Sequence, residues 1–308
     1  MIRLDDLSLF IRSAAMGSFS GAAREADLLP GQVSAAIVRL ERELDIRLFA
    51  RSTRSLRLTP EGAAYLPFAQ EALAALREGG ERLRPESAQL QGSLQVTAPL
   101  DLGRNVLLPW LTQFRALHPK LNLHLSLSDH VSDVFRDPVD VAIRYGDIDD
   151  ASFVALPLAP HNRRVLVASK DYLARHGAPA TLDDLADHCC LLYRLDGRVY
   201  DKWLFPTAAG GSRRIHVAGP LASDSADIVR LWAVAGEGIA YKSWLDVAAD
   251  VAAGRLTVLL GSRVGQSVPL QLVCPHRKQF SPAVRQLQAM LQERCGALTA
   301  ALDQCELT

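Results

Sequence analysis

The sequence predicts an α/β protein that begins with an all-helical module, and two patterns carry this prediction. Up to about residue 59, apolar residues recur three and four positions apart, which is the period of amphipathic helices. From about residue 91, short β-rich runs alternate with helical stretches, a pattern typical of a mostly parallel sheet flanked by helices. A chain of 308 residues can bury more than one core, so about two or three domains are expected.

The composition is that of a globular protein, with 49% hydrophobic and 22% charged residues and a formal net charge of zero. The net charge does not indicate nucleic-acid binding, but arginines gather in one short window. The window contains Arg39, Arg42, Arg47, Arg51, Arg54 and Arg57, against Glu41, Glu43 and Asp45. Such a patch can contact phosphates while the whole molecule stays neutral. The alternative interpretation is a solvated helix face.

The N-terminus carries two acids and no long apolar core, so no signal peptide is expected, and no apolar run approaches the roughly 20 residues of a membrane span. The five cysteines show no CxxC spacing, so neither a disulfide framework nor a zinc site is predicted, and no cofactor is expected. Cys189 and Cys190 are expected to be buried small apolar residues, with a redox-sensing pair as the alternative. These features fit a reducing cytoplasm.

Two short helices are predicted at the start of the chain. The first carries apolar residues at helical spacing and ends at Gly17; these residues are Leu4, Leu7, Phe10, Ile11 and Ala14. Ser18 or Ser20 can cap a second helix that runs to about Ala26.

A tight turn and a third helix follow. Asp27 lies at the turn, where aspartate tolerates a left-handed backbone better than most residues. Pro30 suits the first position of the third helix, which directs Val33, Ile37, Leu40 and Leu44 inward. In a helix-turn-helix, the first turns of this helix contact base edges, and Ala35 and Ala36 are expected on or near its outer side. The residues predicted to contact DNA from this module are Ser20, Pro30, Gly31, Gln32 and Ser34.

A hairpin, or wing, is predicted after the third helix. Leu48–Phe49 and Leu56–Leu58 are expected to form two short strands around a polar turn. The arginines expected to contact phosphates or a minor groove are Arg51, Arg54 and Arg57. A further helix should begin at Thr59–Pro60–Glu61, which supplies a cap, a proline at the first position and an early acid.

From Gly62 to Leu83, the spacing predicts a long helix with an a/d seam. The seam is Gly62, Leu66, Ala69, Leu73, Leu76, Gly80 and Leu83. This face could pack on its own domain, but pairing of two copies is favoured because a DNA reader needs two copies for two half-sites. Pro67 predicts a bend or an unpaired carbonyl, Gly79–Gly80 predicts a hinge, and Pro85 predicts the end of the helix.

Strands and helices alternate in the rest of the chain. The predicted strands are Leu94–Ala98, Val139–Tyr145, Arg164–Ser169, Cys190–Arg194 and Gln271–Cys274, and the predicted helices include residues 102–117, 128–134 and 224–235. Residues 121–128 alternate strictly between leucine and polar residues. This alternation indicates an edge strand with one polar face, for which a subunit contact is one interpretation.

The N-terminal stretch resembles the winged helix-turn-helix of LysR-type transcriptional regulators. The matching pieces are Phe10, Gly17-Ser18-Phe19, Ala22-Ala23, Val33-Ser34, Leu40-Glu41-Arg42-Glu43-Leu44, Arg47-Leu48-Phe49, Arg51, Thr53-Arg54, Leu58-Thr59 and Gly62. The resemblance continues down the chain and is closest to the malate-regulator-like branch. The matching pieces there are Val96-Thr97-Ala98-Pro99, Val141-Ala142-Ile143-Arg144, Tyr172-Leu173-Ala174-Arg175-His176-Gly177 and Gly236-Glu237-Gly238-Ile239-Ala240.

Several positions depart from the family pattern: Ala26, Asp27, Leu29, Ala35 and Ala36. Leu29 replaces the serine or threonine expected to cap the third helix, and the loss of such a cap costs roughly 1 kcal/mol. Ala35 and Ala36 stand where polar or basic residues are frequent. The fold is expected to survive, and Gln32, Ser34 and backbone shape are expected to carry more of the specificity.

The resemblance implies three parts. Residues 1–59 would form the winged helix-turn-helix DNA-binding domain, and residues 60–90 the dimerisation helix. Residues 91–308 would form an effector-binding domain similar to a periplasmic binding protein. Its lobe 1 would comprise about 91–161 and 267–308, and its lobe 2 about 162–266.

The resemblance also implies an effector cleft between the lobes, lined by Thr97, Pro99, Leu100, Ser128, Arg144, Arg198, Ser223 and Asp224. Helices that begin at strand ends present N–H groups that suit anions, so a small anionic effector is expected. Arg144 would be a carboxylate partner, with a structural salt bridge as the alternative. Helix capping is an equal alternative for Thr97 and Ser128, and His161 and His188 are expected to be structural.

The resulting hypothesis is a cytoplasmic transcriptional regulator that binds double-stranded promoter DNA and a small-molecule effector. It would be a dimer through the linker helix and, by the resemblance, a tetramer. One alternative is a solute-binding module with a degenerate DNA head. The other is an enzyme tethered to DNA, and against it stands the lack of a nucleophile elbow, a Walker A loop, a complete dinucleotide fingerprint or HExxH in the sequence.

Overall fold

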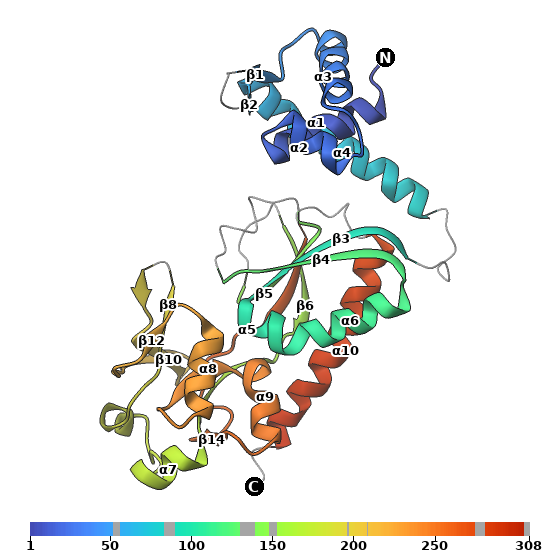
Figure 1. The fold of residues 1–308 in the computed structure, drawn as a ribbon. Coiled ribbons are helices and arrows are strands. Elements are labelled where there is room, and N and C mark those ends of the chain that lie inside the picture. The colour runs from blue at the N-terminus through green and yellow to red at the C-terminus, as the bar shows by residue number, and fades with distance from the viewer. Residues whose placement is uncertain are drawn as a thin grey trace. The chain divides into compact units, whose positions relative to one another are not determined.

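The computed structural model describes residues 1–51, 56–82, 90–129, 139–147, 153–195, 197–207, 209–274 and 281–304. The chain divides into two compact units, Met1–Ala88 and Gln89–Thr308, drawn in Figure 1. The smaller unit is a winged helix-turn-helix, and the larger unit is a two-lobed α/β structure. No helix among the described residues is both long and apolar enough to cross a membrane.

The smaller unit begins with the two predicted helices. Helix α1 (Leu4–Met16) ends at Gly17, whose φ of 55° is left-handed and therefore favours glycine. Helix α2 (Phe19–Glu25) is capped by Ser18, whose Oγ accepts a hydrogen bond from the Gly21 amide at 3.2 Å. Of the two serines that could cap α2, Ser18 therefore does so.

Helix α3 and the turn before it also follow the sequence prediction. Asp27 has the left-handed φ of 53°, and α3 (Pro30–Leu44) begins at the proline. Val33, Ile37 and Leu40 are buried on the inner face of α3. Ile37 and Leu40 join a core in which the Phe10 ring meets the Phe49 ring edge-on, with centroids 5.6 Å apart, while Val33 packs in a smaller cluster between α2 and α3.

The wing and the long helix follow directly. Strand β1 (Phe49–Arg51) pairs antiparallel with β2 (Leu56–Leu58), as predicted. Helix α4 (Pro60–Arg82) is capped by Thr59, whose Oγ1 accepts from the Gly62 amide at 2.9 Å. A side chain at Gly62 would place its Cβ 2.1 Å from the Leu48 carbonyl oxygen, so only glycine allows this close approach.

Only part of the a/d seam predicted for pairing of two copies is exposed on α4. Ala69 is buried, and Leu66 and Leu73 pack against the core of the smaller unit, so the first half of the seam belongs to that core. Among the large apolar side chains of α4 that the structure describes, Phe68 and Leu76 are the exposed ones, at 67% and 54%. The helix continues through Pro67 to Arg82, whereas Leu83 and Pro85 lie outside the described residues.

Lobe 1 of the larger unit is built on a five-stranded sheet, with strand order β4-β3-β5-β15-β6 in the described part of the chain. The strands are β3 (Gln91–Ala98), β4 (Lys120–Leu127), β5 (Val141–Tyr145), β6 (Val154–Ala159) and β15 (Leu270–Cys274). The edge position of β4 confirms the prediction made from its alternating residues.

Lobe 2 carries shorter sheets. Strand β7 (Arg164–Ala168) lies between β13 (Ala240–Ser243) and β14 (Thr257–Leu259), antiparallel to both. Strand β8 (Leu192–Leu195) is parallel to β12 (Ala222–Ser223) and antiparallel to β9 (Arg198–Val199). Strands β10 (Lys202–Pro206) and β11 (Ser212–His216) form an antiparallel pair.

The prediction of a mostly parallel sheet is wrong. In lobe 1, β3 is parallel to β4 and β5, but β15 is antiparallel to β5 and β6. The βα pattern constrains only strands joined by a covering helix, as β3 and β4 are. Strand β15 enters lobe 1 from lobe 2 without such a crossover, so it can run in the opposite direction.

The helix predicted over residues 102–117 is present but is not α-helical throughout. It consists of α5 (Leu100–Leu102), a π-helical segment (Gly103–Leu107) and α6 (Leu108–Leu117). The predicted helix at residues 224–235 is α8 (Ala226–Val234), whereas most of the one at residues 128–134 lies outside the described residues. The other helical elements are α7 (Lys170–His176), a 3₁₀ turn (Asp183–Asp187), α9 (Trp244–Ala252) and α10 (Pro282–Gln304).

Helix α10 packs against both lobes of the larger unit. Its Leu291 and Cys295 lie in the core of lobe 1, and its Leu302 lies in a core of lobe 2. Figure 1 shows α10 in red, beside α9. The lobes therefore share part of their apolar packing.

Of the cysteines and histidines singled out in the sequence, Cys190 is buried and His188 has a structural contact as expected, whereas Cys189 is only partly buried. Cys190 is fully buried, and burial raises the pKa of its thiol to about 12, which opposes formation of a thiolate. Burial also raises the pKa of Cys189. His188 contacts the Tyr172 hydroxyl at 3.1 Å through Nδ1, while His161 lies exposed.

Candidate DNA interface and effector cleft

The start of α3 presents the predicted DNA-contacting residues at the surface. Ser20, Pro30, Gly31 and Gln32 are exposed, and Ser34 is partly buried. A Cβ at Gly31 would meet no atom within 4 Å, so the surface there is open. Leu29, which precedes the helix, is 71% exposed.

Gln32 caps the start of α3, a structural role that was not predicted from the sequence. Its Oε1 accepts a hydrogen bond from the Leu29 amide at 2.8 Å. This contact is one half of a capping box, and it satisfies an amide at the start of α3 although Leu29 offers no side-chain cap. The sequence already indicates this contact, because a glutamine three residues after the N-cap is the spacing of a capping box. The side-chain NH₂ of Gln32 is then the group that can donate to DNA.

The expected position of Ala36 on the outer side of α3 is wrong. Ala36 is fully buried and packs with Val33, Ala22 and Ala23, where α2 crosses α3. A larger side chain there would separate the two helices. Ala35 is exposed, as expected.

The arginine window is partly structural. Arg39 donates to both carboxylate oxygens of Asp6, through Nη2 at 2.7 Å and Nε at 3.2 Å, and this hydrogen bonding raises the pKa of Arg39. Arg47 donates to Glu41 at 2.9 Å, and the same buried carboxylate accepts the Leu48 amide at 2.9 Å.

Of the remaining arginines of the window, two have described side chains and two do not. Arg42 and Arg57 are exposed, and Arg57 pairs with Ala50 in the wing ladder. The side chain of Arg51 and the whole of Arg54 lie outside the described residues. Arg57 is therefore the one predicted wing arginine whose side chain falls within the described residues, and it is exposed.

In the larger unit, three predicted effector residues come together where β3, β4 and β5 end. Arg144 donates through Nη2 to the Thr97 hydroxyl at 3.2 Å and through Nη1 to the Ser128 carbonyl at 3.1 Å. Thr97 and Arg144 are only 4% and 7% exposed. The guanidinium thus holds the ends of β3 and β5 and the residue after β4 together.

The next two predicted residues, Pro99 and Leu100, are partly buried and lead into α5. The Leu100 amide is not left for an external anion, because it donates to Asp129 Oδ1 at 2.9 Å. Asp129 also forms a side-chain hydrogen bond with Tyr193 of lobe 2, and burial together with this carboxylate raises the pKa of Tyr193. Neither Asp129 nor Tyr193 was predicted from the sequence, although Asp129 directly follows Ser128.

The predicted residues of lobe 2 lie around Tyr193. Ser223 stands opposite Tyr193 in the β12–β8 ladder, and its Oγ accepts the Ser225 amide at 3.1 Å. Asp224 and Arg198 are exposed, and Arg198 pairs with Leu195 across β8 and β9. Tyr193 therefore connects the lobe 2 residues to Asp129 of lobe 1.

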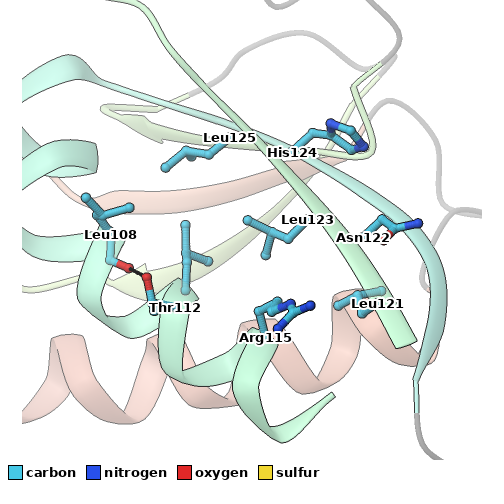
Figure 2. A pocket seen from close by; sticks show the side chains of 9 residues that line it. Leu108, Thr112, Arg115, Leu121, Asn122, Leu123, His124 and Leu125 are labelled. Carbon is cyan, nitrogen blue, oxygen red and sulfur yellow. Dashed lines mark hydrogen bonds between the residues drawn. The ribbon is translucent and has the colours of Figure 1, made fainter. Parts of the chain in front are cut away.

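A separate groove of about 580 Å³ lies on lobe 1, between α6 and the edge strand β4. Figure 2 shows its lining residues, which are Leu108, Leu111, Thr112, Arg115, Leu121, Asn122, Leu123, His124 and Leu125. None of the predicted effector residues lines this groove. Leu108 and Leu117 of α6 are 48% and 70% exposed.

Comparisons with known proteins cover both units. The family of bacterial regulatory helix-turn-helix proteins, lysR family, matches residues 4–63, and the LysR substrate binding domain matches residues 87–296. The HTH-type transcriptional regulator DmlR of Escherichia coli (strain K12) is 34% identical over 257 residues, which cover 83% of each chain. The HTH-type transcriptional regulator CrgA of Neisseria meningitidis serogroup C (strain 8013) is 31% identical over 293 residues, covering 95% of this chain and 97% of its own.

Solved structures give the same result. The structure of CrgA from Neisseria meningitidis, a LysR-type transcriptional regulator, is similar with a TM-score of 0.61 and 29% identity, covering 95% of this chain and 98% of that one. The full-length Vibrio cholerae virulence activator AphB shares the fold, with a TM-score of 0.55, 24% identity and 94% and 98% coverage.

The exposed start of α3, the wing and the two α/β lobes define a DNA-binding transcriptional regulator with a domain for a small-molecule ligand. The relatives are named as regulators rather than as enzymes. This chain belongs to the LysR family of bacterial transcriptional regulators. The matches to DmlR and to the activator TtdR agree with the resemblance to the malate-regulator-like branch.

Proposed function

We propose that this chain regulates transcription in the cytoplasm by reading promoter DNA with α3 and the wing, in response to a small effector in the cleft between the lobes. The observation that carries the proposal is the exposed start of α3 on a well-packed three-helix core, beside exposed Arg57. Gln32 and Ser34 would contact bases, whereas Arg51, Arg54 and Arg57 would contact phosphates.

A footprint and mobility-shift assay on the DNA upstream of the chain's own gene tests this proposal. We expect protection of a specific site at moderate salt. Binding that protects no specific site would support the alternative, a solute-binding module with a degenerate DNA head.

Two observations weaken that alternative. Ala36 departs from the family pattern because it belongs to the helix crossing, and Gln32 replaces the missing cap at Leu29. These departures are thus accounted for by packing and capping, and they do not require a loss of DNA binding.

For the effector, we propose a small carboxylate that binds near Thr97, Leu100 and Ser128. It would have to take over the Leu100 amide from Asp129, since that carboxylate already occupies it. Thermal-shift screening of the whole chain against small carboxylates and aromatics tests this, because a ligand that binds only the folded state raises the apparent stability. Stabilisation by neutral aromatics alone would contradict an anionic effector.

We also propose that the chain assembles as a dimer through α4, with a revised seam. The half of the predicted seam that packs on the smaller unit cannot pair with a second copy. The opposite face exposes Ala64, Phe68, Ala72, Ala75 and Leu76, which recur three and four residues apart. A second copy would cover this strip.

The groove beside β4 is the proposed second contact between copies, which would give the tetramer. Strand β4 is a sheet edge, and such edges pair readily with another chain unless they are covered. Light scattering after size exclusion tests both contacts. Phe68→Glu should abolish the α4 contact, and Leu108→Glu, which changes an exposed residue of the groove, should reduce a tetramer to a dimer; an unchanged mass in both variants would contradict the assignment.

A further inference from the structure

A cluster of buried charged side chains lies where lobe 1 meets lobe 2. This interlobe cluster comprises Asp101, Asp227, Arg230, Lys242, Asp246 and Asp250. Asp101 comes from α5 in lobe 1, and the others come from α8, β13 and α9 in lobe 2. With exposed Arg104 and Arg255, four carboxylates face four cations in the described part of this region.

Asp101 joins the lobes through both of its oxygens. Its Oδ1 accepts from Arg230 Nε at 3.2 Å and from Asn105 Nδ2 at 2.8 Å, and its Oδ2 accepts from Lys242 Nζ. The side chain is 2% exposed. Removing any of these donors would leave part of a buried charge without a partner, which is costly.

Lys242 extends the connection back to lobe 1. Its Nζ lies 3.2 Å from Asp246 Oδ2, and Asp246 Oδ1 accepts from the Tyr145 hydroxyl at 2.7 Å. Tyr145 is the last residue of β5, next to Arg144 of the cleft wall. Burial lowers the pKa of Lys242, but Asp246 and Asp101 together raise it, so its ammonium stays charged.

Asp101 is also the direct neighbour of a cleft residue. The Leu100 amide faces Asp129 in the cleft, while the Asp101 carboxylate faces the interlobe cluster. The π-helical segment that follows packs tightly, since a Cβ at Gly103 would lie 2.2 Å from Leu127 Cδ2 at the end of β4. A shift of the backbone at Leu100 must therefore move Asp101 against Lys242 and Arg230.

We propose that Asp101 is a positioning residue that transmits occupation of the cleft to the contact between the lobes, through Lys242 and Arg230. This inference rests on the proposed effector cleft, because it assigns the route by which that cleft acts. It goes beyond the role of a stabilising ion pair, which would hold the lobes without coupling them to the cleft.

Asp250 provides a matched control. It is also a buried carboxylate bound to Arg230, at 2.8 Å, and it accepts from Arg255 at 2.7 Å. All of these partners belong to lobe 2. Asp101→Asn and Asp250→Asn each remove one buried charge from the same arginine, but only the first changes a contact between the lobes.

Hydrogen exchange on the full-length chain, without added ligand, compares the two variants. We expect Asp101→Asn to speed exchange about tenfold both in residues 99–107 and in β13 and α9. Asp250→Asn should speed exchange only in α8 and α9. The same exchange pattern in both variants would overturn the proposal, since a merely structural role predicts it.

The operator footprint gives a second readout that a loss of stability alone would not move. Asp101→Asn should change the length of the protected DNA without effector, whereas Asp250→Asn should keep the wild-type footprint. Should Asp101→Asn fail to fold, Asp101→Glu, which keeps the charge but displaces it from its donors, takes its place in both measurements, with Asp250→Glu as its control. If the wild type protects no specific DNA, the proposed function fails, while the exchange comparison still decides the role of Asp101.

Discussion

The two units of the chain place their cations differently. In the smaller unit, Arg39 and Arg47 have side chains that are 45% and 75% exposed beside their carboxylate partners. In the larger unit, Arg230 and Lys242 are 12% and 7% exposed. An exposed cation can exchange a carboxylate for a phosphate because water solvates it throughout, whereas a buried cation depends on the partners already around it. Exposure alone therefore leaves a cation free to meet a new partner only where its present carboxylate is not itself buried, as Asp6 is beside Arg39, whereas the buried set of the larger unit has fixed geometry.

The largest expected effect follows from removing a buried cation. Lys242→Ala leaves the Asp101 and Asp246 carboxylates buried without their shared partner, so the free energy of unfolding should fall by about 3–5 kcal/mol. Denaturant unfolding followed by circular dichroism measures the change. Arg255→Ala is the control, because its side chain is 52% exposed, and it should cost less than about 1 kcal/mol. Equal losses would break the contrast between buried and exposed cations.

The next effect concerns glycine in the smaller unit. Gly62→Ala forces a Cβ to within 2.1 Å of the Leu48 carbonyl, so α4 must move away from the wing at a cost of about 2 kcal/mol. Gly79→Ala in the same helix meets no atom within 4 Å and should stabilise the helix by about 0.5–1 kcal/mol. Thermal unfolding of both variants measures the difference. A neutral Gly62→Ala would mean that the helix does not approach the wing this closely.

Local patterns allowed most of the smaller unit to be predicted. The left-handed positions at Gly17 and Asp27 and the cap at Thr59 lie within one or two turns of the helices they delimit. The burial of Ala36 could also have been predicted, because residues 33, 36, 37 and 40 follow one helical stripe. The pair between Arg39 and Asp6 could not, since it joins residues 33 positions apart.

The larger unit depends on contacts that no local pattern contains. The antiparallel β15 returns from lobe 2, and Asp101 meets Lys242 across 141 positions of the chain. The resemblance grouped Thr97, Ser128 and Arg144, and the structure does bring these three residues together, while their contact with an effector stays a prediction. The sequence missed Asp129 and Tyr193, since their pairing requires the relative placement of two lobes.

A smaller effect is expected when an exposed arginine of the wing is removed. Arg57→Ala should weaken binding about tenfold on specific and non-specific DNA alike, and the slope of log affinity against log salt should fall by about one. Arg39→Ala is the comparison, because it leaves the Asp6 carboxylate, which is 4% exposed, without its bidentate partner. Arg39→Ala should lower the stability of the smaller unit and leave the salt slope unchanged. Titrations at several salt concentrations separate the two results.

The smallest expected effect tests the carboxylate that occupies the cleft. Asp129→Asn keeps an acceptor for the Leu100 amide but removes a negative charge that would oppose an anionic ligand, so a small carboxylate found by thermal shift should bind about three- to fivefold more tightly. Asp140→Asn is the control, because Asp140 makes the same kind of contact, to the Gln95 amide at 2.8 Å, and Gln95 lies away from the cleft end of β3.

Each variant weakens one carboxylate-to-amide hydrogen bond, and Asp129→Asn also alters the hydrogen bond to Tyr193, so it should lose at least as much stability as Asp140→Asn. Calorimetric titration of the whole chain with the same carboxylate then isolates the effect of charge on binding. Tighter binding in Asp129→Asn but not in Asp140→Asn would show that the partly buried Asp129 gives up the Leu100 amide when a ligand arrives. Unchanged affinity would place Asp129 instead with the fixed charges of the larger unit.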